Sequence, residues 1–193
     1  MPVPTPLPFT PTRLTLRDGL HVLLREICEL DRSGLLAAFS RLSADARYTR
    51  FMAPMRELPE AMVEQATHPE PDHECALVAW SEAQAGEGGG RLVGGARFVA
   101  APGSDICEFA ITLDDDWHGA GLARILMSSL IDTARARGYA RMEGFVLAMN
   151  TPMRRLARRL GFTDVGCPDD ATVRIVTLQL DQQADAAGDE VEL

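Results

Sequence analysis

The sequence contains no lysine. All 19 of its basic residues are arginine, against 28 acidic residues, and the formal net charge at pH 7 is −9. Nonspecific binding to nucleic acid depends on a surplus of positive charge facing the phosphate backbone. We therefore do not expect an acidic chain of this kind to have a nucleic-acid partner.

Long apolar runs are also missing, and none approaches the ~20 residues that a membrane-spanning helix requires. The N-terminal segment MPVPTPLPFTPTR has proline at positions 2, 4, 6, 8 and 11. It has no basic stretch ahead of an apolar one, which argues against both a signal peptide and a helix. We therefore expect a cytoplasmic protein with no membrane partner.

Cysteines are few and widely spaced, at positions 28, 75, 107 and 167. The sequence has no Cys-x-x-Cys pair and no Cys/His group with the spacing of a zinc site. It therefore predicts free thiols and no bound metal.

A chain of 193 residues, 46% of them hydrophobic, is long enough to form one domain with a substantial core. Its ends are polar or proline-rich and have no periodicity. We expect an extended proline-rich arm over 1–12, a single domain over 13–181 and a mobile acidic tail over 182–193.

Within the domain, strand and helix signals alternate irregularly. Apolar alternation and turn residues predict strands over 14–16, 21–27, 74–80, 92–99, 106–113, 141–147, 163–166 and 173–180. Helical periodicity and capping residues predict helices over 30–42, 44–51, 59–66 and 119–137, and a short helix capped by Thr151. The mixture of hairpins and crossovers predicts an α/β (α+β) fold with a mixed sheet.

The most informative stretch joins strand 106–113 to helix 119–137 through the turn His118-Gly119-Ala120-Gly121-Leu122-Ala123. Amide N–H groups at a helix N-terminus and the helix dipole together favour an anion. The turn therefore predicts an anion site. Eight arginines and only two acidic residues over 122–160 fit either a polyanionic ligand or a solvated basic face.

This turn resembles the Gln/Arg-x-x-Gly-x-Gly/Ala signature of the GCN5-related N-acetyltransferases (GNAT superfamily). The resemblance implies a mostly antiparallel sheet of about seven strands with helices on both faces. It places the acetyl-CoA cleft where the parallel strands 106–113 and 141–147 splay apart. It also implies that the turn binds the pyrophosphate of the cofactor through His118, Gly119, Ala120, Gly121, Leu122 and Ala123. His118 departs from the signature, so it is either a pH-dependent phosphate contact or an exposed residue without a role.

Glu108 is the only carboxylate of strand 106–113, on the face it shares with Ala110 and Thr112. An amine must lose a proton before it can attack a thioester, and a lysine-like amine has a pKa of about 10.4. The resemblance implies that Glu108 is the general base for this step. A solvated glutamate at the sheet edge is the alternative.

The resemblance also assigns the rest of the cofactor site. Ile111, Thr112 and Leu113 lie along the pantetheine arm, with an N–H near Ile111 on the thioester carbonyl. Asn150 hydrogen-bonds the same arm, unless it only begins the next helix. Many members have a tyrosine that protonates the leaving thiolate at the position of Ala157, so here that proton is expected to come from water.

The segments 41–51 and 95–98, with Leu58, resemble bacterial protein lysine acetyltransferases of the Pat type, which act on metabolic enzymes. We expect acetyl transfer to a primary amine, preferably a protein lysine, by direct attack in a ternary complex. The alternatives are a small amine, such as a polyamine or an aminoglycoside, and a non-catalytic acyl-CoA-sensing module. Arg50, Phe51 and Arg97 either line the acceptor side or serve ordinary packing.

Codon bias is the simpler explanation for the absence of lysine, and the alternative is an enzyme that cannot acetylate its own side chains. We expect a monomer or a homodimer.

Overall fold

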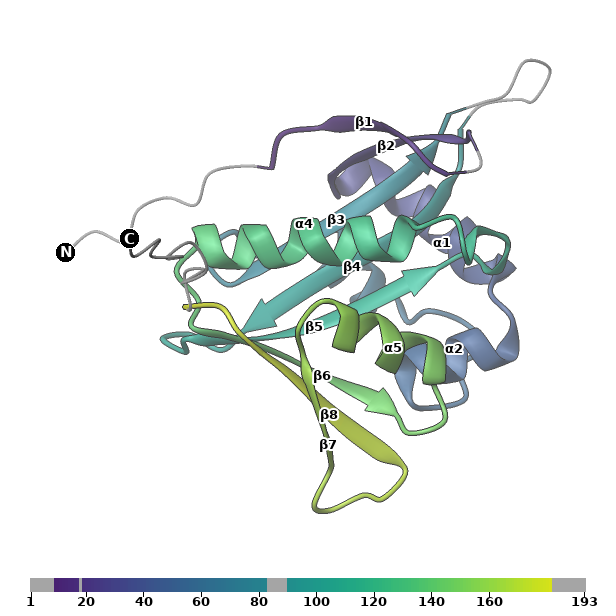
Figure 1. The fold of residues 1–193 in the computed structure, drawn as a ribbon. Coiled ribbons are helices and arrows are strands. Elements are labelled where there is room, and N and C mark those ends of the chain that lie inside the picture. Colours follow the sequence, from purple (N-terminus) through teal and green to yellow (C-terminus); the bar gives the residue numbers. More distant parts are fainter. Residues whose placement is uncertain (1–8, 18, 83–89, 182–193) are drawn as a thin grey trace, which may run out of the picture.

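The structure, a computed structural model, describes residues 9–17, 19–82 and 90–181. These residues form one sheet of eight strands in the order β1-β2-β3-β4-β5-β6-β8-β7 (Figure 1). Every neighbouring pair is antiparallel except β5 and β6. The strands are β1 (Thr12–Thr15), β2 (His21–Glu26), β3 (Glu74–Ser81), β4 (Leu92–Ala100), β5 (Ile106–Leu113), β6 (Arg141–Leu147), β7 (Thr163–Gly166) and β8 (Val173–Gln179).

Helices cover both faces of the sheet (Figure 1). One face carries α4 (Leu122–Ala136) and α5 (Thr151–Arg159), and the other carries α1 (Arg32–Arg41), α2 (Ala44–Phe51) and α3 (Glu60–Thr67). Short 3-10 turns precede α1 and the glycine turn: η1 (Glu29–Asp31) and η2 (Asp115–Trp117). None of the helices within the described residues is both long enough and apolar enough to cross a bilayer.

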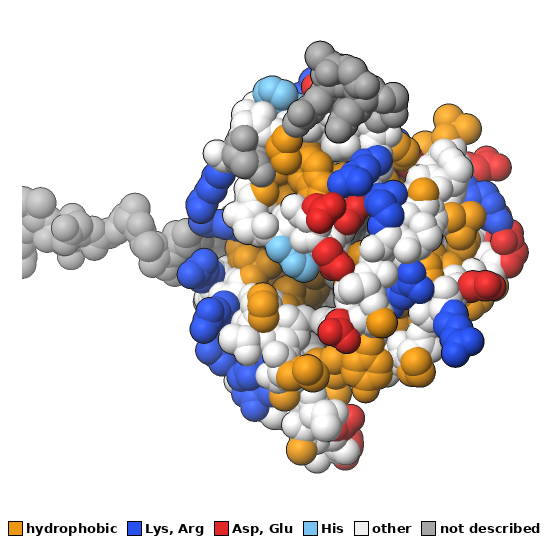
Figure 2. Space-filling view, turned by 90° about the vertical axis from the view of Figure 1, so that its right-hand side faces the viewer, with side chains coloured by type: hydrophobic (Ala, Val, Ile, Leu, Met, Phe, Trp, Pro, Cys, Tyr) orange, Lys and Arg blue, Asp and Glu red, His pale blue; other side chains and the backbone are white. Residues whose placement is uncertain are grey.

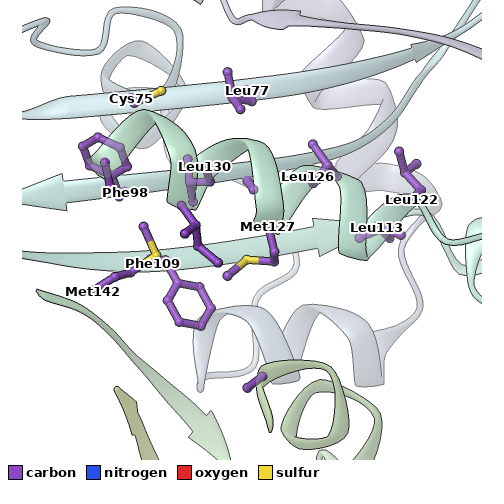
Figure 3. Packing of buried hydrophobic residues seen from close by; sticks show 14 of the residues in the cluster. Cys75, Leu77, Phe98, Phe109, Leu113, Leu122, Leu126, Met127, Leu130 and Met142 are labelled. Carbon is purple, nitrogen blue, oxygen red and sulfur yellow. The ribbon is translucent and has the colours of Figure 1, made fainter. Parts of the chain in front are cut away.

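The main core lies between the sheet and α4 (Figure 3). Leu122, Leu126 and Leu130 recur every four residues on one side of α4 and are fully buried. They pack with Phe98 of β4 and other apolar side chains of the sheet. Burying each large apolar side chain is worth about 1.5–3 kcal/mol. This packing fixes α4 on the sheet, and with it the position of its N-terminus.

The predicted fold class is confirmed, since the sheet is mixed and its one parallel pair is β5–β6. The number of strands matches the sequence pattern and exceeds by one the seven that the resemblance implied. The predicted start of the long helix at 119 was wrong. Gly119 and Gly121 have φ angles of 88° and 92°, in the left-handed region that cannot continue a right-handed helix, so α4 begins at Leu122.

The cap of α5 also differs from the prediction. Asn150, not Thr151, caps the helix, because its Oδ1 accepts a hydrogen bond from the N–H of Met153 at 3.1 Å. Strand β1 begins at Thr12, inside the segment predicted as an arm. The rest of that arm up to residue 8, most of the predicted hairpin loop (83–89) and the predicted tail (182–193) lie outside the described residues.

Candidate active site

The parallel strands β5 and β6 separate after a short paired stretch. Residues 106–108 pair with 141–143, and both strands then continue without pairing to each other. The N-termini of α4 and α5 lie at this open end of the sheet (Figure 1). The opening therefore combines unpaired strand edges with two helix N-termini.

The main chain of β5 offers its odd-numbered residues to this opening. The N–H of Asp114 donates to β4 at 2.8 Å, whereas the carbonyl of Asp105 accepts from the N–H of Ala140, just before β6, at 2.8 Å. Successive residues of a strand direct their main-chain groups to opposite sides. Ile111 and Leu113 therefore direct theirs toward β6, beyond the last paired residues. This leaves the N–H of Ile111, predicted to contact the thioester carbonyl, accessible to a ligand.

Five consecutive amides, from Gly119 to Ala123, have no hydrogen-bond acceptor among the described residues. The hydrogen bonds of α4 begin only with Arg124 and Ile125, whose N–H groups donate to the carbonyl of Gly121 at 3.1 and 3.2 Å. Any helix leaves its first N–H groups unpaired, and here the three residues before the helix add theirs. This donor set suits an anion with several oxygens, such as a pyrophosphate.

Gly119 and Gly121 make this turn possible through their backbone angles. A Cβ atom at Gly119 would meet nothing within 4 Å, and one at Gly121 would meet only Nε of Arg17 at 4.0 Å. The glycines are therefore required for the shape of the turn, and the space in front of them is open to a ligand.

Two aspartates hold the turn to the helices on the other face of the sheet. Nε of Arg41 donates to Asp114 Oδ2 at 2.7 Å, and the N–H of Ser43 donates to Asp115 Oδ2 at 3.2 Å. The sequence alone does not predict these contacts. The run of aspartates after strand 106–113 was a signal, but it did not identify partners about 70 residues away.

Glu108 and Glu143 lie in register where β5 and β6 begin to separate, and both line a cavity of about 610 Å³. Partial burial raises the pKa of Glu108, the charge of Glu143 raises it further, and the charge of Arg50 opposes both effects. A carboxylate with a raised pKa is a stronger base for proton transfer. Glu143 was not among the predicted site residues.

Arg50, Phe51 and Arg97 lie on the α1–α3 side of the sheet. A second, largely apolar cavity of about 330 Å³ lies between these helices and the sheet, and all three residues line it. Arg50 and Arg97 also line the cavity of Glu108, so the two cavities adjoin.

Three predicted cofactor residues have specific placements. The main chain of Thr112 faces β4, opposite Gly95, and its side chain lines the apolar cavity, so it lies on the acceptor side of β5. Asn150 Oδ1 is engaged as a helix cap, and its amide nitrogen has no acceptor among the described residues. His118 is exposed beside the glycine turn.

Two other side chains bear on the chemistry. Cys107 is fully buried on the face opposite Glu108, and burial raises the pKa of its thiol to about 12. Ala157 of α5, at the position where the resemblance implies a tyrosine, is fully buried in the main core. Neither position presents a nucleophile or an acid to the opening.

Of the eight arginines over 122–160, three are exposed and have no carboxylate within 4.0 Å among the described residues: Arg124, Arg155 and Arg159. Figure 2 shows the open end of the sheet, where a hollow with apolar side chains in its floor lies next to a row of basic side chains. No group of three or more His, Cys, Asp or Glu side chains in the described ranges is placed to hold a metal.

The chain matches the family model described as "Acetyltransferase (GNAT) family" over residues 37–162. It is 37% identical to "Acetyltransferase PA5475" of Pseudomonas aeruginosa over 166 residues, which make up 86% of this chain and 88% of that protein. It is 29% identical to "Acetyltransferase Pat" of Mycolicibacterium smegmatis over 92% of this chain and 55% of Pat, so it spans about half the length of that relative.

Solved structures of acetyltransferases are also similar to this chain. The GNAT domain of S. lividans PAT superposes with a TM-score of 0.77 at 25% identity, covering 88% of this chain and 96% of that domain. The Salmonella typhimurium protein yncA, solved with acetyl-CoA, has the same fold, with a TM-score of 0.61 at 22% identity and coverage of 86% and 99%. The chain therefore belongs to the GNAT family and is an acetyltransferase.

Proposed function

We propose that this protein transfers an acetyl group from acetyl-CoA to a primary amine by direct attack in a ternary complex. The observation that carries the proposal is the row of amides from 119 to 123, which have no acceptor among the described residues and lie beside the open edge of β5. These donors fit a pyrophosphate, and the dipole of α4 adds about 0.3–1 kcal/mol per favourable charge. CoA carries a further phosphate outside its pyrophosphate, and the exposed Arg124, Arg155 and Arg159 supply positive charge for it.

Acetyl-CoA supplies a thioester, and this chain's residues act on either side of it. The N–H of Ile111 donates to the carbonyl oxygen, a kind of contact worth about 2.7–4 kcal/mol as negative charge develops there. The amide nitrogen of Asn150 donates to the pantetheine arm. Glu108, on the acceptor side of the same strand, takes the proton of the amine directly or through water.

Direct attack is supported by the state of the cysteine nearest to the base. Cys107 adjoins Glu108 in sequence, but it is buried on the opposite face, and its raised pKa keeps the thiol protonated at neutral pH. An acyl-cysteine intermediate at this position is therefore disfavoured.

Two classes of acceptor have support. The resemblance of segments 41–51 and 95–98 to the Pat-type protein lysine acetyltransferases favours a protein lysine side chain, with a metabolic enzyme as the partner. The similarity to Pat and to the GNAT domain of PAT agrees with this resemblance. A small-molecule amine is the second candidate, because the adjoining cavities of about 610 and 330 Å³ each lie within the ~300–1,000 Å³ typical of small-ligand sites.

Calorimetric titration with acetyl-CoA tests the proposal. We expect Gly121→Glu to abolish binding, because it places a negative side chain in front of the pyrophosphate donors. Gly138→Glu is the matched control: Gly138 also has a positive φ, of 82°, with nothing within 4 Å of its Cβ position, but it lies past the other end of α4. Equal binding by Gly121→Glu and Gly138→Glu would overturn the assignment of the turn, and no binding by the wild type would overturn the proposal.

A further inference from the structure

The two adjoining cavities differ in character, and Arg50 lies at their junction. The larger cavity has the carboxylates of Glu108 and Glu143 on its β5–β6 wall. The smaller one is walled mainly by apolar side chains from α1, α2 and α3 and the following segments, including Leu35, Phe39, Phe51, Leu58 and Met62. Arg50, Arg97 and Ala110 line both. A ligand at this junction would meet negative, positive and apolar surfaces together.

The positive surface is only partly neutralised by the protein. Arg97 donates to Glu74 at 3.2 Å. Arg50 has no carboxylate within 4.0 Å among the described residues, and its guanidinium lies 4.8 Å from the ring of Phe51. Burial, assisted by the charge of Arg97, lowers the pKa of Arg50 to about 10, although Glu108 opposes this shift. A guanidinium in this position favours an anionic ligand group, because its own charge is incompletely compensated.

The negative surface is also only partly compensated. Glu108 and Glu143 face the same cavity side by side, and Nε of Arg141 is 3.9 Å from Glu143, at the limit of an ion pair. Two adjacent carboxylates favour a cation between or beside them. The ammonium group of an acceptor meets this requirement.

We propose that these surfaces together bind an α-amino acid with an apolar side chain, as the acceptor of the acetyl group. Glu108 and Glu143 hold the ammonium group, Arg50 binds the carboxylate, and the cavity under α1–α3 takes the side chain. The inference rests on the proposed acetyl transfer and develops its small-molecule alternative. A polyamine has no carboxylate for Arg50, and an isolated lysine side chain has none beside its amine.

The reaction balances without any further reactant. Glu108 removes a proton from the ammonium, the nitrogen forms a bond to the thioester carbonyl carbon, and the carbon–sulfur bond breaks. As the amide forms, the nitrogen loses its second proton to water and the CoA thiolate takes a proton from water, so the products are an N-acetyl amino acid, CoA and the proton that Glu108 then releases to solvent.

The wild-type protein alone provides the first test. CoA release is measured with acetyl-CoA and leucine, glycine, leucinamide or isoamylamine, and products are identified by mass spectrometry. We expect kcat/KM for leucine to exceed that for leucinamide by roughly tenfold or more, because leucinamide has no carboxylate and loses the charge-assisted hydrogen bond to Arg50. Leucine should exceed glycine by a similar factor, because glycine leaves the apolar cavity unfilled.

Variants assign the carboxylate contact to Arg50. Arg50→Met should reduce the ratio of kcat/KM for leucine to that for leucinamide roughly tenfold, so that the preference disappears. Because the charge of Arg50 also lowers the pKa of Glu108, this ratio within the variant is the readout, and not either rate alone. Arg50→Lys, which keeps the positive charge, should retain part of the preference for leucine. Arg13→Met is the control, since Arg13 lies on β1 and its side chain is 82% exposed.

Three outcomes overturn the inference. Equal kcat/KM for leucine and leucinamide in the wild type would do so, as would an unchanged preference in Arg50→Met. Acetylation of a lysine peptide but of no amino acid would overturn it while leaving the proposed acetyl transfer intact. Absence of acetyl-CoA binding in the calorimetric titration would instead overturn both.

Discussion

At the scale of single residues, the surroundings of Glu108 set the pH range in which an amine can be acetylated. Burial raises the pKa of this carboxyl above its ordinary 4.5, and the charge of Glu143 raises it further. Below its pKa the carboxyl is protonated and cannot accept a proton. Activity should therefore fall as the pH falls through a value above 4.5. This fall is the acid limb of the pH profile, and its position depends on Glu143.

Glu108→Gln should lower kcat by about 10²- to 10⁴-fold, the usual contribution of a general base, with little change in acetyl-CoA affinity. Glu143→Gln removes a like charge, lowers the pKa of Glu108 and should move the acid limb to lower pH. Profiles of kcat/KM against pH, measured with the same amine, check this because the ionisation of the amine is common to all variants. An acid limb that stays in place or moves to higher pH in Glu143→Gln would contradict the role of Glu143.

At the scale of elements, the separation of β5 and β6 begins at an aromatic contact. Phe109 and Gly144 each follow the last paired residue of their strands. A Cβ at Gly144 would lie 2.5 Å from Cε1 of Phe109, so the glycine permits the ring to pack on β6. The ring also packs edge to face with Phe162, with centroids 5.4 Å apart. The ring of Phe109 therefore packs into the core at the position where β5 and β6 diverge.

Gly144→Ala should destabilise the fold by about 1–3 kcal/mol, because the ring of Phe109 must move in a packed core. The free energy of unfolding in urea measures the effect. Gly166→Ala is the matched control in strand β7: Gly166 also lacks a positive φ, but the nearest atom to its Cβ position is Nη1 of Arg174 at 3.6 Å. Similar losses in the two variants would show that the Phe109 contact is not responsible.

The same two strands show what the sequence can predict. The bounds of 106–113 and 141–147 follow from short apolar runs between turn residues, and both agree with the structure. The glycine turn is likewise local, so its shape follows from nearby residues. Glu143 beside Glu108 and Arg50 in the cavity wall depend on strand order and helix packing. No local pattern brings residues 35 or more positions apart into one site.

At the scale of the whole molecule, one buried carboxylate connects three elements near the C-terminal end of the domain. Asp164 of β7 has a side chain only 3% exposed and accepts hydrogen bonds from Arg154 and Arg158 of α5 and Arg174 of β8, at 3.0, 2.7 and 2.6 Å. Burial alone would raise the pKa of Asp164, but the three arginines outweigh it and lower the pKa to about 2. In an acidic chain with a net charge of −9, this cluster is a local concentration of positive charge that needs its carboxylate.

Asp164→Asn should therefore lower stability in a pH-dependent way. The pKa falls from 3.8 in the unfolded chain to about 2 in the folded one, so the contribution is present above about pH 4 and is lost as the pH falls toward 2. Because the arginines are partly exposed and solvent screens them, we expect a loss of about 1–2 kcal/mol at pH 7. Urea unfolding at pH 7 and pH 3 measures this loss of stability, and the difference from wild type should be smaller at pH 3.

Asp132→Asn is the control. It changes an exposed carboxylate 3.5 Å from Arg135 and should change stability by less than about 0.5 kcal/mol at either pH. A difference between Asp164→Asn and wild type that is the same at both pH values would mean that the ionised carboxylate does not hold α5, β7 and β8 together.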